Sequence, residues 1–183
     1  MVVTAISSEE LQWTNGLATG LSADSRAVGH QVAQELLPHL SAETIGLFVF
    51  PDGLTDHLEP FFAGLEENLS SEQFLPLWGG GAVNNFSYEE PTYQYCDDEV
   101  ISDGVSYALL SGTAQASWAI SHSLIPIGGE RIVTRSQGNV IHEIDGKPAL
   151  EVLKEYLPEH ALADERDWMR YAIALALTFK APS

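Results

Sequence analysis

Apolar residues follow two different spacings in the first half of the chain, and together they predict alternating strands and helices. In residues 22–39, Val28, Val32 and Leu36 stand four positions apart, which predicts a helix with one buried stripe. Residues 44–50 are almost continuously apolar, as is typical of a strand buried on both faces. A strand before them, and a helix and a short strand after them, complete a predicted βαβαβ order; these segments are residues 11–19, 55–69 and 74–78.

Shorter strand patterns separated by turn residues follow in the second half, which favours antiparallel pairing. Residues 131–136 and 140–144 flank Gln137-Gly138-Asn139, which predicts a hairpin with Gly138 at positive φ. A helix is expected to begin at Pro148. The other β-like runs are residues 92–96, 104–112 and 114–121, and a last helix is expected from Asp164 to about residue 179. The predicted fold class is α/β (or α+β), with a mixed sheet and helices packed on it.

Charge and composition restrict the classes of partner. The net charge is −18, and residues 1–130 hold 18 acidic residues against one basic residue, Arg26. Such a surface repels phosphate backbones and anionic lipids, so we expect neither nucleic-acid nor membrane binding. The longest apolar run near an end has seven residues, the N-terminus has no basic segment, and the single cysteine, Cys96, fits a reducing compartment. These features predict a cytoplasmic protein.

Residue patterns that support catalysis or metal binding are weak. Cys96 precedes Asp97, Asp98 and Glu99, whose charge should raise the pKa of its thiol, and a Gly-x-Ser-x-Gly motif does not occur. No two of the six histidines have the spacing of a helical metal site. We therefore expect no enzyme and no metal site, although one histidine would suffice as a haem ligand.

Several motifs in fixed order resemble the N-terminal domain of the FIST (F-box and intracellular signal transduction) family. Residues 121–157 hold a His-containing turn, then P-x-G, V-T-x-x-x-G-N and D-G-x-P-A-L. Residues 16–35 and 74–85, and D-G-V at residues 103–105, are similar to earlier parts of that domain. The resemblance covers about residues 12–158. It implies a FIST N-terminal-like domain over residues 1–158, and a helical extension over residues 159–183 that resembles the start of a missing FIST C-terminal region.

The family resemblance implies an intracellular small-molecule sensor domain in signal transduction, binding an amino-acid-like ligand and coupling to a signalling protein partner. Its candidate ligand-binding residues are Gly80, Gly81, Asn84, Asn85, Arg135 and Asn139. Amides there offer both donors and acceptors, and Arg135 could bind a carboxylate. Close backbone packing of the glycines, a salt bridge from Arg135 to Glu143 or Asp145, and a turn role for Asn139 are the competing interpretations.

Two other functions remain open at this stage. Some relatives bind haem and respond to nitric oxide, and His122 is the candidate haem ligand because it lies in the family motif. A hydrogen-bonded structural histidine is the simpler interpretation. A partner-recruiting module is the third possibility, with the C-terminal helix as its contact surface and homo-oligomerisation as one form of it.

Overall fold

The computed structural model describes residues 7–55, 58–69, 75–84, 90–117, 119, 125, 127–138 and 140–158. The chain divides into two compact units, Met1–Trp118 and Ala119–Ser183. The domain boundary expected at residue 158 coincides with the last described residue, so it stays a prediction, as does the helix expected after Asp164.

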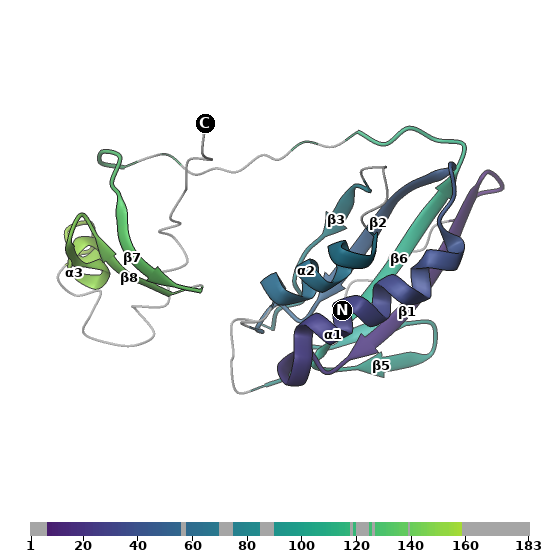
Figure 1. Ribbon diagram of the computed structural model, residues 1–183, viewed down its shortest axis with the longest axis horizontal. Coiled ribbons are helices and arrows are strands. Elements are labelled where there is room, and N and C mark those ends of the chain that lie inside the picture. The colour runs from purple at the N-terminus through teal and green to yellow at the C-terminus, as the bar shows by residue number, and fades with distance from the viewer. Residues whose placement is uncertain are drawn as a thin grey trace. The chain divides into compact units, whose positions relative to one another are not determined.

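A four-stranded mixed sheet forms the centre of the first unit (Figure 1). Its order is β1 (Leu11–Thr19), β6 (Gly104–Gly112), β2 (Thr44–Pro51) and β3 (Leu77–Gly79). Strand β6 runs antiparallel to both neighbours, whereas β2 and β3 are parallel. The predicted mixed α/β class is confirmed. The expected βαβαβ segment does not form a contiguous parallel sheet, because β6 lies between β1 and β2.

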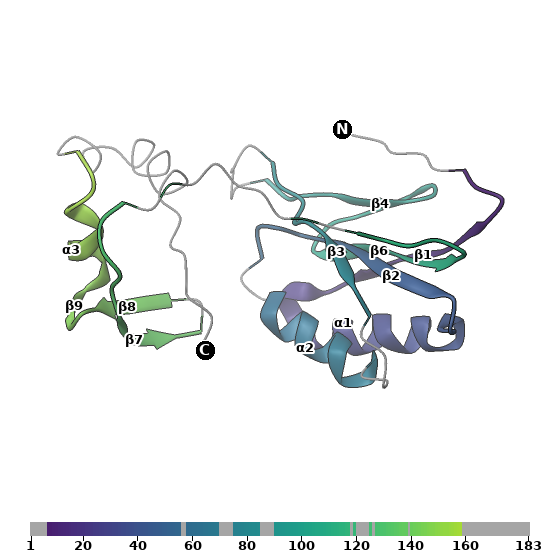
Figure 2. The same ribbon diagram turned by 90° about the horizontal axis from the view of Figure 1, so that it is seen from above.

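Two helices cover one face of this sheet, as Figure 2 shows. They are α1 (Leu21–Leu36), which continues into a 3-10 turn (Leu37–His39), and α2 (Leu58–Leu69). Alternate residues of the strands point at the helices, so Leu47 and Leu109 are fully buried against Phe61. The predicted apolar stripe of the first helix is confirmed, since Val28, Val32 and Leu36 all belong to this core.

The beginning of α1 is stabilised in two steps. Gly20 has left-handed φ at the helix start, and Asp24 interrupts the helical geometry one turn later. The Oδ1 atom of Asp24 then accepts a hydrogen bond from the backbone N–H of Ala27 at 3.0 Å. Asp24 thus caps the part of the helix that follows it, while Ser22 is bound by Asp103.

The opposite face of the sheet carries a small hairpin, formed by β4 (Gln94–Cys96) and β5 (Glu99–Ile101) (Figure 2). Strand β4 contacts β1 and β6. Cys96 Sγ accepts a hydrogen bond from Asn15 Nδ2 at 3.0 Å, which ties the hairpin to β1. The sequence pattern did not predict β5, and it wrongly predicted a strand from residue 114, because residues 114–117 form none.

The second unit contains β7 (Val133–Gln137), β8 (Val140–Ile144), β9 (Lys147–Pro148) and α3 (Ala149–Lys154). Strands β7 and β8 form the expected antiparallel hairpin, with Gly138 at φ 54°. Pro148 is the residue before α3 rather than in its first turn, because it still pairs with Glu143 of β8. No helix among the described residues is long and apolar enough to cross a membrane.

Candidate functional site

Three strands of the first unit end at one edge of the sheet. Because β6 is antiparallel to β1 and β2, and β3 is parallel to β2, strands β1, β2 and β3 all point the same way. Their last residues are Thr19, Pro51 and Gly79. Open α/β sheets bind ligands beyond the carboxyl ends of their parallel strands, and β2 and β3 form such a parallel pair here. We call this region the carboxyl edge, and it holds Gly20, Asp52, Gly80, Gly81 and Asn84.

The triple glycine, which begins with the last residue of β3, serves two different purposes. A Cβ atom on Gly79, whose φ is 153°, would lie 1.8 Å from the carbonyl oxygen of Val49, and one on Gly81 would lie 2.6 Å from the Cα atom of Gly53. Close backbone packing is therefore confirmed for these two glycines. A Cβ atom on the exposed Gly80 would meet nothing within 4 Å, so space beside its backbone is open.

Asn84 has an unused acceptor at this edge. Its Nδ2 atom donates to the carbonyl oxygens of Glu90 and Pro91 at 2.5 and 3.3 Å. Its Oδ1 atom is buried and has no hydrogen-bond partner among the described residues. A buried acceptor without a partner costs about 1–3 kcal/mol, so a donor supplied by a ligand would be bound favourably.

Gln94 provides a second unused acceptor near the same edge. Its side chain is 2% exposed; Nε2 donates to Thr92 Oγ1 at 3.0 Å, and Oε1 has no partner among the described residues. Gln94 pairs with Ile101, whose side chain packs against Gly104, and Gly104 pairs with Thr19 at the end of β1. The third buried polar atom of this kind, Trp13 Nε1, belongs to the other end of β1.

Asp103 occupies the N-terminus of α1. Its carbonyl oxygen accepts the N–H groups of Gly20 and Leu21 at 2.8 and 3.2 Å. Its carboxylate accepts the N–H and hydroxyl groups of Ser22 at 2.8 and 2.7 Å. The protein's own carboxylate thus fills the position that an anion would take at a helix start. Acceptor atoms without a hydrogen-bond partner, together with carboxylates, make the carboxyl edge suited to a ligand that donates hydrogen bonds.

The described residues of the predicted ligand set belong to two different units. Gly80, Gly81 and Asn84 lie at the carboxyl edge, whereas Arg135 belongs to β7 in the second unit. There Arg135 Nε lies 2.9 Å from Glu143 Oε1, as the salt-bridge interpretation predicted. Asn85, His122 and Asn139 lie outside the described residues, so their roles stay predictions.

Sequence reasoning missed Gln94 and Asp103. The alternation of Thr92 and Gln94 with Tyr93 and Tyr95 predicted a strand, but the pattern could not show that its polar face is the buried one. Asp103 stands in the D-G-V stretch of the family resemblance, which gives it no binding role.

Comparison with known proteins assigns the family. The family model of the FIST N domain matches residues 1–147. The chain belongs to the FIST N domain family. This confirms the resemblance seen in the sequence motifs, and it places the chain among sensor domains of signal transduction.

One relative of this FIST N domain is an uncharacterized protein from Methanocaldococcus jannaschii. The two are 32% identical over 92 residues, which cover 48% of this chain and 18% of the relative. The chain therefore spans less than a fifth of the length of the curated relative that it matches. No solved structure matches the chain.

Among the described residues, no group of three or more His, Cys, Asp or Glu side chains is placed to hold a metal ion. Burial raises the pKa of the Cys96 thiol, the hydrogen bond from Asn15 opposes this, and Asp97 and Glu99 add to it. The direction agrees with the sequence expectation, although burial is the larger cause. Burial and the hydrogen bond to Glu35 likewise raise the pKa of Tyr107.

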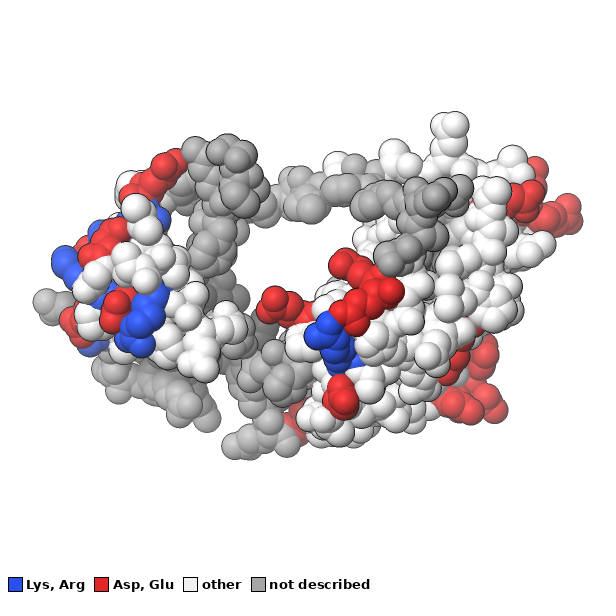
Figure 3. Space-filling model, viewed as in Figure 1, with Lys and Arg blue, Asp and Glu red and all other residues white. Residues whose placement is uncertain are grey.

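Each unit has a pocket whose lining does not include the triple glycine. One of about 380 Å³ lies at the opposite edge of the sheet, where Thr44, Pro76 and Gly112 are among its lining residues. The other, of about 530 Å³, lies beside α3 of the second unit and is lined by Lys147 and Glu151, among others. Figure 3 shows basic and acidic side chains interspersed on the second unit. On the visible face of the first unit, the basic side chain is that of Arg26, and acidic side chains lie around it.

Proposed function

We propose that this FIST N domain is a cytoplasmic, non-enzymatic sensor that binds a small amino-acid-like ligand at the carboxyl edge and passes the binding signal to a partner protein. Two observations carry this proposal: the buried Oδ1 atom of Asn84 has no partner among the described residues, and the surroundings of Gly80, four positions earlier in the chain, are open. An α-ammonium group has three N–H donors and could satisfy this acceptor.

Charge favours the same class of ligand. Arg26 is the single basic residue among residues 1–130, and it forms an ion pair with Glu67 across the two helices. The edge therefore offers little to attract a phosphate, while Asp52 and Asp103 attract positive charge. A zwitterion or an amine fits these groups better than a nucleotide does.

A binding role also fits the side-chain chemistry of the first unit better than catalysis. Nucleophilic catalysis needs a thiolate or an alkoxide activated by a nearby base. The raised pKa of Cys96 holds its thiol protonated at neutral pH, and the groups around it are carboxylates and an amide. These observations support a binding module.

Calorimetry of the full chain against the twenty amino acids tests the proposal. We expect heat from at least one amino acid, and Asn84→Ala should weaken that binding about tenfold, because the ammonium loses its acceptor. Gln31→Ala is the control, since it removes an amide from an exposed position of α1, where the side chain donates to Glu35. No heat from any amino acid, or equal affinity after Asn84→Ala, would contradict the proposal.

A further inference from the structure

Strand β1 has one side without a strand partner in the part of the chain that the structure describes. It lies at the end of the sheet and pairs with β6 alone. Backbone hydrogen bonds at both ends of this pair show which residues of β1 bond to β6. Glu10 accepts from Thr113 at 3.4 Å, and Gly20 donates to Asp103 at 2.8 Å.

In an antiparallel pair, alternate residues bond to the partner strand and the others point away. The even-numbered residues of β1 therefore bond to β6. The N–H and C=O groups that point outward belong to Leu11, Trp13, Asn15, Leu17 and Thr19.

This edge lacks the features that usually prevent strand addition. Natural edge strands are short, charged, bulged or interrupted by proline. Strand β1 has nine residues with the sequence LQWTNGLAT, without charge or proline. Its register with β6 is continuous from Leu11 opposite Gly112 to Thr19 opposite Gly104. The opposite edge strand, β3, has three residues. The long edge is therefore a template for one more strand.

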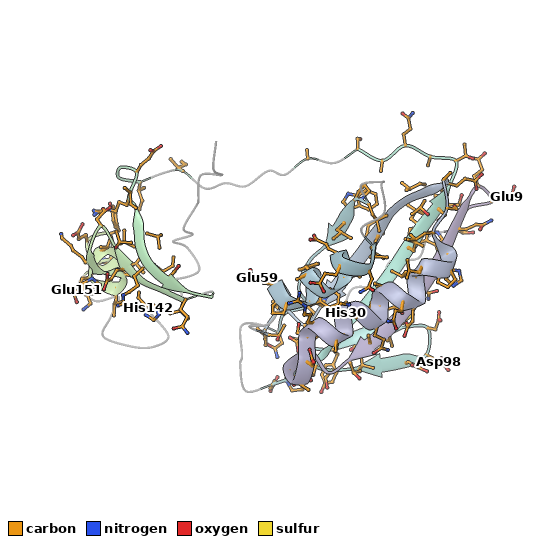
Figure 4. All side chains as sticks on the ribbon, viewed as in Figure 1. Glu9, His30, Glu59, Asp98, His142 and Glu151 are labelled. Atoms are coloured by element: carbon orange, nitrogen blue, oxygen red, sulfur yellow. The ribbon has the colours of Figure 1, made fainter. Side chains whose placement is uncertain are left out.

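The charges beside β1 indicate what kind of strand would be added. The hairpin turn that follows β4 carries Asp97, Asp98 and Glu99, and Asn15 Nδ2 lies 3.4 Å from both carboxylate oxygens of Asp97. Figure 4 labels Asp98 at this turn. A second copy of the chain paired through β1 would bring two such acidic turns together. A strand that carries lysine or arginine would be attracted instead.

We propose that β1 is the docking edge for an extended, basic segment of a partner protein, which adds to the sheet as a fifth strand. Main-chain hydrogen bonds to the outward-facing residues of β1 supply the pairing, and the acidic turn selects the charge. This surface is separate from the carboxyl edge, and the proposal stands whether or not an amino acid binds there.

Amide hydrogen exchange followed by NMR on the full chain tests this edge. The probe is an end-blocked ten-residue peptide of alternating lysine and threonine, and its counterpart alternates glutamate and threonine. We expect the lysine peptide to slow the exchange of the outward-facing amides of β1 by about tenfold, because they enter a sheet ladder. The even-numbered amides, already bonded to β6, should change little, and added salt should weaken the effect.

Two variants separate strand addition from charge attraction. Asn15→Pro removes an outward-facing N–H, which an edge strand tolerates, and should abolish the protection. Asn15→Ala loses the same contacts to Cys96 and Asp97 but keeps the N–H group, so it should retain the protection. If Asn15→Pro fails to fold, a lysine peptide methylated on alternate backbone nitrogens replaces it and should not protect β1.

Four outcomes would overturn the proposal. They are unchanged exchange of the outward-facing amides with the lysine peptide, equal protection by the glutamate peptide, and full protection by the methylated peptide. The fourth is a doubled solution mass with the outward-facing amides already protected, which would assign the edge to a second copy of the chain.

Discussion

Gly79 and Gly80 are neighbours in the chain, but the surroundings of their Cα atoms are opposite. Gly79→Ala should reduce the free energy of unfolding by about 1–3 kcal/mol, because the new Cβ would overlap the carbonyl oxygen of Val49. Gly80→Ala meets open space and should leave stability within about 0.5 kcal/mol. Urea unfolding of both variants measures the difference. Equal losses would show that the triple glycine acts as one packing element.

Cys96 should be a slow nucleophile. Because burial holds the pKa of its thiol above the ordinary range, the thiolate fraction at neutral pH is lower than that of a free cysteine. Alkylation by iodoacetamide should therefore be slower than that of glutathione at pH 7, and its rate should rise only in alkaline solution. Rates measured between pH 6 and 10 check this. A rate plateau reached near neutrality would mean a lowered pKa.

Helices α1 and α2 approach closely through a pair of glycines. A Cβ atom on Gly29 would lie 2.1 Å from the carbonyl oxygen of Phe61, and one on Gly64 would lie 2.2 Å from that of Arg26. Neither obstacle is a flexible side chain, so a larger residue would force the helices apart.

In Gly29→Ala, helix propensity and packing therefore have opposite effects on the free energy of unfolding. Alanine is favoured over glycine by about 1 kcal/mol inside a helix, yet overpacking costs about 1–3 kcal/mol. Because the overlap is with backbone atoms, we expect packing to dominate and the thermal midpoint to fall. Ala27→Gly, at an exposed position of the same helix, is the control for propensity alone. A higher midpoint for Gly29→Ala would show that the helices separate without cost.

Local patterns predicted most elements of the sheet but not their order in space. Residues 104–112 have the bounds of β6 as expected, because turn residues flank an apolar run. Nothing within that segment shows that it lies between β1 and β2, since its position depends on pairing with residues 54 to 101 positions earlier in the chain. Residues 114–117, with the sequence AQAS, form no strand, and they hold none of the β-branched or aromatic residues that favour one.

The residues of the candidate site, too, could be predicted together only where they are close in the sequence. Gly80, Gly81 and Asn84 follow one another in the sequence, so a single motif predicted them together. Gln94 reaches the carboxyl edge only through the fold of the hairpin, and no local pattern marks it. Arg135 was grouped with the glycines from family resemblance, and the structure gives it to a different unit.

The first unit has a hydrophobic core of its own. The described residues of that core lie between Ala18 and Leu109, within the first unit. A fragment of residues 1–118 should therefore fold alone and unfold cooperatively in urea. Leu109→Ala in this fragment should cost about 2–5 kcal/mol, because Leu109 is almost fully buried. A fragment whose circular dichroism spectrum shows no cooperative transition would mean that the second unit is needed for folding.

The central place of β6 has a consequence for synthesis on the ribosome. Strand β1 is made first, but its partner in the sheet begins at Gly104. Until that segment leaves the exit tunnel, β1 and β2 cannot pair with β6, which lies between them in the sheet. The nascent chain therefore exposes these two strands together with α1 and α2. Closing the sheet is thus delayed, and chaperones that shield apolar segments during translation have a defined interval in which to act.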